Sequence, residues 1–225
     1  MSVSPVDTGT SLQAVLFDMD GTLVDTEPYW IAAEYALVES FGGTWSDEHA
    51  HALVGNALID SAIYIRAHGG VDLDPPVIVE RLLDEVVRAS QRSIPWRPGA
   101  RELLASLAER GIPCALVTMS YARLAETVTE ALPPGTFAAV ITGDQVAAGK
   151  PHPEAYLTAM ARLGVTPQTS VAIEDSPTGV ASAEAAGCVV LAVPHNVPIP
   201  AGPGRVLVDS LTEVDVDQLA LLLNR

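Results

Sequence analysis

The chain has 225 residues, of which 48% are hydrophobic, and a formal net charge of −16. This length allows one large domain, or one domain with a sizeable insertion. The negative charge argues against nucleic-acid and anionic-membrane partners, because both require basic patches. No apolar run reaches the ~18 residues that a membrane-spanning helix needs.

The N-terminal segment, residues 1–12, is polar and lacks the basic and apolar regions of a secretory signal, so it predicts a flexible leader. The two cysteines, Cys114 and Cys188, lie within or beside apolar runs. This setting indicates buried strand residues, not a disulfide or a metal pair. We therefore expect a cytoplasmic protein, and we expect a monomer because nothing in the sequence requires a partner copy.

The first predicted strand is the apolar run Ala14–Asp18. The next strand begins only at Cys114, although a complete strand–helix–strand unit takes about 30 residues. The sequence between them has helical patterns, namely a helix over 28–40 and amphipathic stripes over Ile59, Ala62, Ile63 and over Val79, Leu82, Leu83, Val86, Val87. We therefore predict a small helical domain over residues 26–95, inserted into a core formed by residues 13–25 and 96–225.

Beyond the insertion, apolar strands alternate with helices. The predicted strands are 114–118, 139–142, 170–174, 188–193 and 205–208, and the predicted helices are 101–110, 121–132, 153–163 and 177–186. The tail carries a Ser210-x-x-Glu213 capping box and predicts a last, leucine-rich helix. This alternation predicts an α/β fold, a Rossmann-like doubly wound parallel sheet covered on both faces.

Polar residues follow four of the predicted strands, at the edge where an open parallel sheet binds its ligands. These residues are Asp18, Asp20, Thr118, Lys150, Glu174 and Asp175. Lys150 is the single lysine beside eleven arginines, and a compact ammonium is not interchangeable with a planar guanidinium in a narrow site. Four carboxylates and one ammonium at one edge predict a site for a metal ion and a phosphate.

Each motif also has an ordinary structural explanation. Asp20-Gly21 is a common turn, and Thr118 alone would be an ordinary strand residue. Ser176 before Pro177 is a simple helix N-cap. Only the convergence of all the motifs on one sheet edge distinguishes a site from scattered polar residues.

Taken in order, four motifs resemble those of the haloacid dehalogenase-like (HAD) phosphohydrolase superfamily. They are Asp18-x-Asp20-Gly21-Thr22, Thr118, Lys150-Pro151 and Glu174-Asp175-Ser176. The resemblance is to members with a helical cap after the first strand, the phosphatase and β-phosphoglucomutase-like group. Asp25-Thr26-Glu27-Pro28 is similar to the sugar-phosphate phosphatases of that group. The resemblance implies a Rossmann-like core and a cap domain that acts as a lid.

The resemblance also implies roles for the residues at the sheet edge. Asp18 is the expected nucleophile, because a carboxylate can form an aspartyl-phosphate with the substrate. Asp20 is expected to protonate the leaving oxygen and then to activate water. Thr118 is expected to bind a phosphoryl oxygen, and Lys150 to neutralise the charge of the transferring group.

The same resemblance implies a Mg²⁺ cofactor, which prefers hard oxygen ligands. Asp18 and Asp175 are the expected side-chain ligands, with Glu174 assisting them. The backbone carbonyl of Asp20 is expected to complete the protein's share of the metal site.

Within the family, the sequence favours a phosphatase. Dehalogenases lack the acid at Asp20 and the metal, and the cap has no lysine for the Schiff base of a phosphonatase. The β-phosphoglucomutases have a histidine where this chain has Trp30 and a basic loop where residues 54–58 carry no charge. A mutase must hold a bisphosphate through cationic residues. We therefore expect a Mg²⁺-dependent hydrolase of small sugar, polyol or glycolate phosphates. A mutase and a catalytically silent phosphate-binding protein remain the alternatives.

Cap residues are expected to contact the part of the substrate that carries no phosphate. Glu27, Trp30 and Asn56 are the predicted contacts from the cap, and Met119 and Ser120 are those from the core beside Thr118. An uncharged loop and a tryptophan suit a neutral polyol or sugar better than a second phosphate.

Overall fold

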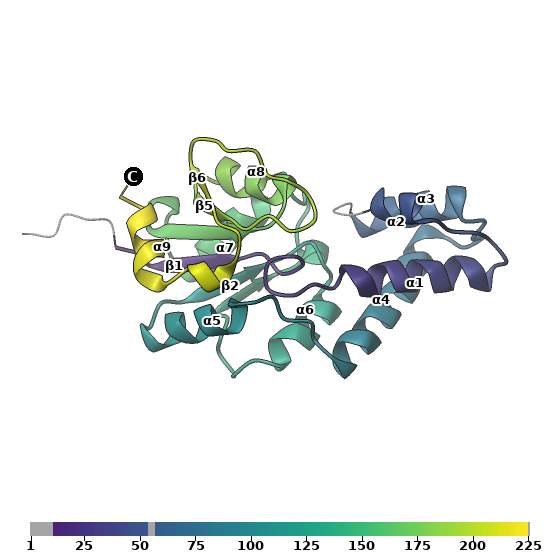
Figure 1. The fold of residues 1–225 in the computed structure, drawn as a ribbon, viewed down its shortest axis with the longest axis horizontal. Coiled ribbons are helices and arrows are strands. Elements are labelled where there is room, and N and C mark those ends of the chain that lie inside the picture. The colour runs from purple at the N-terminus through teal and green to yellow at the C-terminus, as the bar shows by residue number, and fades with distance from the viewer. Residues whose placement is uncertain (1–10, 54–56, 225) are drawn as a thin grey trace, which may run out of the picture.

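The computed structural model describes residues 11–53 and 57–224. Within these residues the centre is a six-stranded parallel sheet in the order β3-β2-β1-β4-β5-β6 (Figure 1). The strands are β1 (Ala14–Phe17), β2 (Cys114–Val117), β3 (Ala139–Ile141), β4 (Ser170–Glu174), β5 (Val189–Ala192) and β6 (Arg205–Leu207). The predicted Rossmann-like α/β class is therefore confirmed, and the order reverses between β1 and β4.

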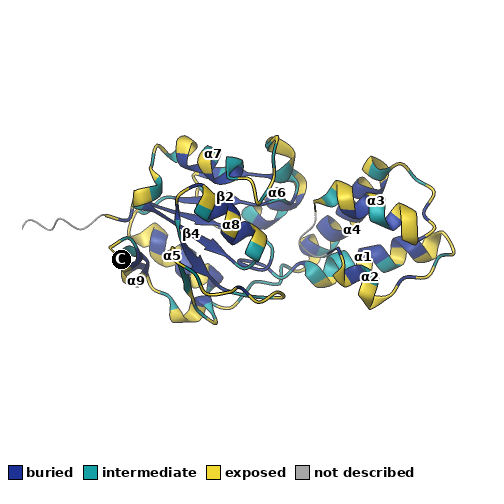
Figure 2. Cartoon of the chain, turned by 90° about the horizontal axis from the view of Figure 1, so that it is seen from above, coloured by how far each residue is buried: buried dark blue, intermediate teal, exposed yellow. Residues whose placement is uncertain are grey.

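Helices cover both faces of the sheet. On one face, α5 (Ala100–Glu109), α6 (Ala122–Glu130) and α9 (Val216–Leu222) share an apolar cluster with Val15 and Phe17 of β1. On the other face, α7 (Glu154–Leu163) and α8 (Pro177–Ala185) pack with Leu16. Short 3₁₀ turns lie at Gly143–Gln145, Pro167–Thr169 and Leu211–Glu213. The strands are accordingly buried between two helical layers (Figure 2).

The register of the central strands brings the predicted site residues to one edge. Phe17 lies opposite Leu116 of β2 and Ile173 of β4, so these three strands end at the same level. The residues that follow them, Asp18, Thr118 and Asp175, therefore begin their loops side by side.

Two details at the ends of the chain differ from the prediction. Leu12, predicted in the leader, is buried, while residues 1–10 lie outside the described residues. In the tail, the predicted box at Ser210 starts a 3₁₀ turn and not the last helix. Helix α9 has its own capping box, in which Asp215 and Gln218 exchange hydrogen bonds of 2.7 and 2.8 Å. The two boxes are five residues apart in the sequence, and only the second precedes a sustained apolar face.

Four helices between β1 and α5 form the helical segment, which lies at one end of the molecule (Figures 1 and 2). They are α1 (Glu27–Ser40), α2 (Asp47–His51), α3 (Leu58–His68) and α4 (Pro75–Arg92). The two linkers to this segment lie side by side, because Val24 and Trp96 form an antiparallel bridge. None of the helices in the described part of the chain is long and apolar enough to cross a membrane.

The helical segment also contacts the core away from the linkers. Arg123 of α6 forms ion pairs with Glu80 at 2.9 Å and Asp84 at 2.5 Å, both on α4. The predicted apolar stripe of α4 is buried, as expected from its spacing. Of the predicted stripe of α3, Ala62 is buried as expected, but the prediction is wrong for Ile59 and Ile63, which are exposed. Helix α3 buries Ser61 and Ile65 beside Ala62, and a face that includes serine and alanine is not revealed by hydrophobicity alone.

A buried carboxylate in the helical segment gives a pH-dependent prediction. Glu34 of α1 is 5% exposed and accepts a hydrogen bond from the Trp45 indole at 3.2 Å. Burial raises the pKa of Glu34 to about 7, the charge of Glu27 adds to the increase, and the Trp45 bond opposes it. The folded pKa exceeds the ordinary value of 4.5, so Glu34 favours folding at low pH. The free energy of unfolding therefore decreases as the pH rises towards 7.

We therefore expect Glu34→Gln to remove part of this pH dependence, since Gln keeps an acceptor for Trp45 without the charge. The variant should exceed the wild type in unfolding free energy at pH 8 by up to about 3 kcal/mol, and the difference should vanish near pH 4.5. Urea unfolding at a series of pH values measures this difference. Glu39→Gln, exposed on the same helix, is the control. An equal pH profile for Glu34→Gln and the wild type would contradict the prediction.

Candidate active site

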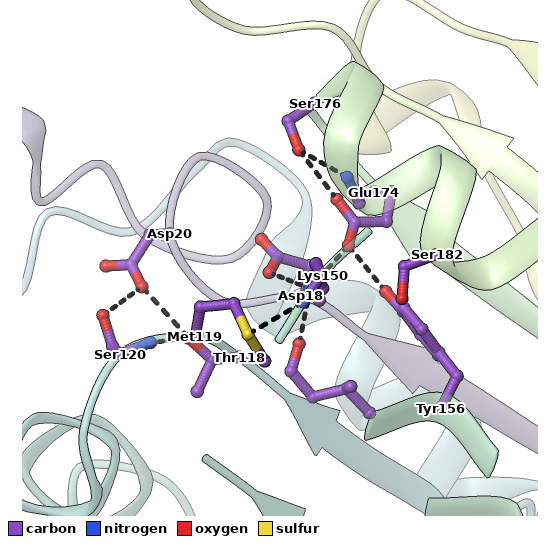
Figure 3. A network of polar contacts seen from close by, with 12 residues as sticks. Asp18, Asp20, Thr118, Met119, Ser120, Lys150, Tyr156, Glu174, Ser176 and Ser182 are labelled. Atoms are coloured by element: carbon purple, nitrogen blue, oxygen red, sulfur yellow. Dashed lines mark hydrogen bonds and ion pairs between the residues drawn. The ribbon is translucent and has the colours of Figure 1, made fainter. Parts of the chain in front are cut away.

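The single lysine of the chain lies among carboxylates at the carboxyl edge of the sheet (Figure 3). Its Nζ donates to Asp18 Oδ1 at 2.7 Å, to Glu174 Oε1 at 2.6 Å and to the Val117 carbonyl at 2.8 Å. The three N–H donors of the ammonium are thus all used. Burial by itself would lower the pKa of Lys150, but the charges of Asp18 and Glu174 raise it above its ordinary value. The ammonium therefore stays charged.

The loop that carries Lys150 is held by Met119. The backbone N–H of Lys150 donates to the Met119 sulfur at 3.2 Å. A side chain at Gly149 would place its Cβ 2.9 Å from the same sulfur. Glycine before the lysine therefore leaves room for the Met119 side chain.

Tyr156 of α7 contacts two members of the same cluster, Glu174 and Lys150. Its hydroxyl donates to Glu174 Oε1 at 2.7 Å, and its ring lies 5.2 Å from the Lys150 Nζ. The side chain is fully buried. Tyr156 thus fixes the carboxylate that pairs with Lys150. This role could not be predicted from the sequence, because a tyrosine on an apolar helix face is typical of core packing.

Three carboxylates, those of Asp18, Glu174 and Asp175, form the acidic group in which a metal fits. Each offers an oxygen, and the three oxygens lie within 4.8 Å of one another. Asp18 Oδ2 is buried and has no hydrogen-bond partner within the described residues. Burial, with the charges of neighbouring carboxylates, raises the pKa of Glu174 to about 7 and of Asp175 to about 9. The negative charge here exceeds what one ammonium compensates, which suits a hard divalent cation.

Two glycines allow these carboxylates to approach the backbone. A Cβ at Gly21, whose φ is +88°, would lie 2.0 Å from Asp175 Oδ2. A Cβ at Gly179 would lie 1.9 Å from Glu174 Oε2. The Gly in the Asp-x-Asp-Gly motif is therefore required by the close packing of Asp175 as well as by the turn.

Asp20 lies beside this group, with its carboxylate held by hydroxyl groups. Thr26 donates to Oδ1, while Ser120 and Thr118 donate to Oδ2 at 2.8 and 3.2 Å. Burial raises the pKa of Asp20, the charge of Asp18 adds to this, and the hydroxyl bonds oppose it. A raised pKa favours the protonated carboxyl, the form that a general acid needs. Asp20 contributes no side-chain oxygen to the acidic group.

The predicted site residues thus divide into three sets. Asp18, Asp20, Thr118, Lys150, Glu174 and Asp175 come together at one edge, with Met119 and Ser120 bonded to members of this cluster. Glu27 and Trp30 lie on α1, where Trp30 is half-buried against an apolar cluster and Glu27 accepts a hydrogen bond from Asn196. Asn56 lies outside the described residues.

Besides the role of Tyr156, the contacts of Thr26 and Asn196 were not predicted from the sequence. Thr26 precedes α1 and resembles an ordinary N-cap, but its hydroxyl bonds Asp20 and does not cap the helix. Asn196 lies almost 170 residues from its partner Glu27. Only the fold reveals that the two segments meet.

Known proteins resemble this chain over most of its length. A family model for haloacid dehalogenase-like hydrolases matches residues 12–187. Hexitol phosphatase A of Escherichia coli is 36% identical over 188 residues, which cover 79% of this chain and 81% of that protein. The phosphorylated carbohydrates phosphatase of Thermotoga maritima is 32% identical over 177 residues, which cover 78% and 82%.

A solved structure has the same arrangement. A variant of CbbY from Rhodobacter sphaeroides, in complex with xylulose-(1,5)bisphosphate, superposes with a TM-score of 0.84 and 28% identity. The match covers 92% of this chain and 99% of that one.

Proposed function

The chain belongs to the haloacid dehalogenase-like hydrolase family, and on this premise we propose that it removes phosphate from small sugar or polyol phosphomonoesters. The observation that carries the proposal is the buried Lys150 ammonium, 2.7 Å from Asp18, with Asp20 beside them in an environment that raises its pKa. A nucleophilic carboxylate, a fixed cation and a protonated carboxyl are what this hydrolysis needs.

In the first step, Asp18 attacks the phosphorus and forms an aspartyl-phosphate. The bond from phosphorus to the ester oxygen breaks, and that oxygen takes the proton of Asp20. Protonation by a positioned acid typically contributes ~10²–10⁴-fold to the rate. The three hydroxyl bonds to Asp20 hold the acid in place for this transfer.

In the second step, water attacks the phosphorus of the aspartyl-phosphate. Asp20, now ionised, accepts a proton from that water, and phosphate leaves while the Asp18 carboxylate is restored. Lys150 offsets the negative charge on Asp18 and on the transferring group through both steps. Thr118, whose hydroxyl donates to Asp20, would bind a phosphoryl oxygen.

The acidic group would hold Mg²⁺ through Asp18 and Asp175, with Glu174 beside them and the Asp20 carbonyl as a further ligand. When bound, the ion would neutralise the phosphate oxygens and the excess charge of the carboxylates. Without it, the carboxylates and the chain's net charge of −16 would repel a phosphorylated substrate. Asp18 Oδ2, which has no hydrogen-bond partner among the described residues, supports this assignment.

We propose that residues 26–95 form the cap, which closes over the substrate and excludes water. The paired linkers at Val24 and Trp96 are suited to act as a hinge. The Arg123 ion pairs to α4 are exposed, so they are weak enough to break when the cap moves.

A neutral sugar or polyol is the favoured leaving group, because the relatives named above are phosphatases of hexitols and phosphorylated carbohydrates. Trp30 on α1 also suits a neutral sugar or polyol better than a leaving group that carries a second phosphate. A mutase is less well supported, and a silent binding protein would not need Asp18, Asp20, Lys150 and Asp175 together.

From the sequence alone, we also propose that the protein is cytoplasmic and monomeric.

The test is phosphate release from a panel of sugar, polyol and glycolate phosphates. We expect release with Mg²⁺ and its loss in excess EDTA, with recovery when Mg²⁺ is restored. A hexitol phosphate should exceed phosphoglycolate in kcat/KM. Conversion of a hexose 1-phosphate into its 6-phosphate without phosphate release would support the mutase instead, and no turnover of any ester would support the binding protein.

A further inference from the structure

The loop between β5 and β6 begins at the edge of the sheet that carries the catalytic groups. The N–H of Val193, directly after β5, donates to the Glu174 carbonyl at 2.8 Å. From there the loop extends toward the helical segment (Figure 1). Its residues have no part in the steps described above.

Two side chains of this loop contact the last part of the linker and the first residue of α1. His195 Nε2 lies 3.3 Å from Asp25 Oδ1, and the Asn196 amide donates to the Glu27 carboxylate. Asp25 and Glu27 flank Thr26, whose hydroxyl bonds Asp20. The two pairs are therefore anchored to residues on either side of the threonine that holds Asp20, the acid proposed to protonate the leaving oxygen.

The chemistry of these pairs suits hydroxyl groups. A carboxylate accepts hydrogen bonds from hydroxyls, and a primary amide both donates and accepts them. Asn196 is exposed, and the Asp25 side chain is 33% exposed, so a ligand can reach both pairs. The two carboxylates repel a second phosphate.

We propose that His195 and Asn196 are specificity-determining residues, which form with Asp25 and Glu27 a subsite for the hydroxyl groups of the leaving group. This inference rests on the proposed function and names the part of the chain that selects the substrate. The subsite joins the core to the start of α1, so a polyol bound there also bridges core and cap.

The test compares two esters, sorbitol 6-phosphate, rich in hydroxyls, and phenyl phosphate, which has none. Sites that hydrogen-bond a substrate hydroxyl discriminate strongly against analogues that lack it. For Asn196→Ala, the ratio of kcat/KM for sorbitol 6-phosphate to that for phenyl phosphate should fall about tenfold, mainly through KM, which corresponds to one lost hydrogen bond of about 1.4 kcal/mol. His195→Ala should lower the ratio in the same direction.

Asn224→Ala is the matched control, because Asn224 follows α9 at the end of the core away from the cap (Figure 1). Its ratio should equal that of the wild type. If Asn196→Ala and His195→Ala lower kcat/KM equally for both esters, or leave the ratio unchanged, the subsite is wrong although the phosphatase stands. If the wild type with Mg²⁺ hydrolyses neither ester, the proposed function itself fails.

Discussion

Asp18→Asn is expected to lower kcat for every phosphomonoester by at least ~10⁴-fold, the loss that follows removal of a covalent nucleophile. Asn has the shape of Asp, but an amide does not attack phosphorus as a carboxylate does. The surrounding geometry should persist, because the Lys150 ammonium retains its bonds to the Val117 carbonyl and to Glu174. The loss should therefore lie in chemistry and not in folding.

Two measurements check this result. Rapid quenching of the wild type with substrate should trap a chain heavier by one phosphoryl group, which mass spectrometry detects and which Asp18→Asn should lack. Asp217→Asn serves as the control, because this aspartate is exposed on α9 and pairs with Arg110, away from the carboxylate cluster. Release that persists in Asp18→Asn would assign the nucleophile to another residue.

The central cluster could be predicted because it follows from sheet geometry. Asp18, Thr118 and Glu174 lie at or just after the ends of β1, β2 and β4, and these strands pair in register. In a parallel sheet the carboxyl ends of the strands lie at one edge, which leaves little freedom in where the loops start. The length between the first two strands likewise required an inserted segment.

The rest depends on tertiary packing that local patterns do not contain. Tyr156 looks like a core residue until Glu174 is placed beside it. The α3 prediction failed at two residues, because Ile59 and Ile63 follow helical spacing yet are exposed, while Ser61 is buried beside Ala62. Small residues where helices approach closely carry almost no hydrophobic signal.

The sharpest test of the charge balance is replacement of the single lysine. Lys150 is 5% exposed at its side chain, and three acceptors surround one nitrogen at 2.6–2.8 Å. A guanidinium is wider and spreads its donors over a plane, so Lys150→Arg should not restore the contacts. We expect it to lower kcat by about 10²–10³-fold, as when one stabilising donor is lost.

Lys150→Met keeps much of the volume and removes the charge, so it isolates the electrostatic part. The carboxylates already have folded pKa values above their ordinary ones, about 7 for Glu174 and about 9 for Asp175. Groups with raised pKa values favour folding at low pH and oppose it as the pH rises through those values. Without the ammonium, the unfolding free energy in EDTA should fall by about 3–5 kcal/mol at pH 8, and the loss should shrink towards pH 5. Added Mg²⁺ should offset part of it.

Urea unfolding of Lys150→Met at pH 8 and pH 5, with EDTA and with Mg²⁺, measures the loss of unfolding free energy under each condition. The control is Arg162→Met, which removes an exposed cation of α7. Equal losses at the two pH values would mean that Lys150 supports the fold through packing and not through its charge.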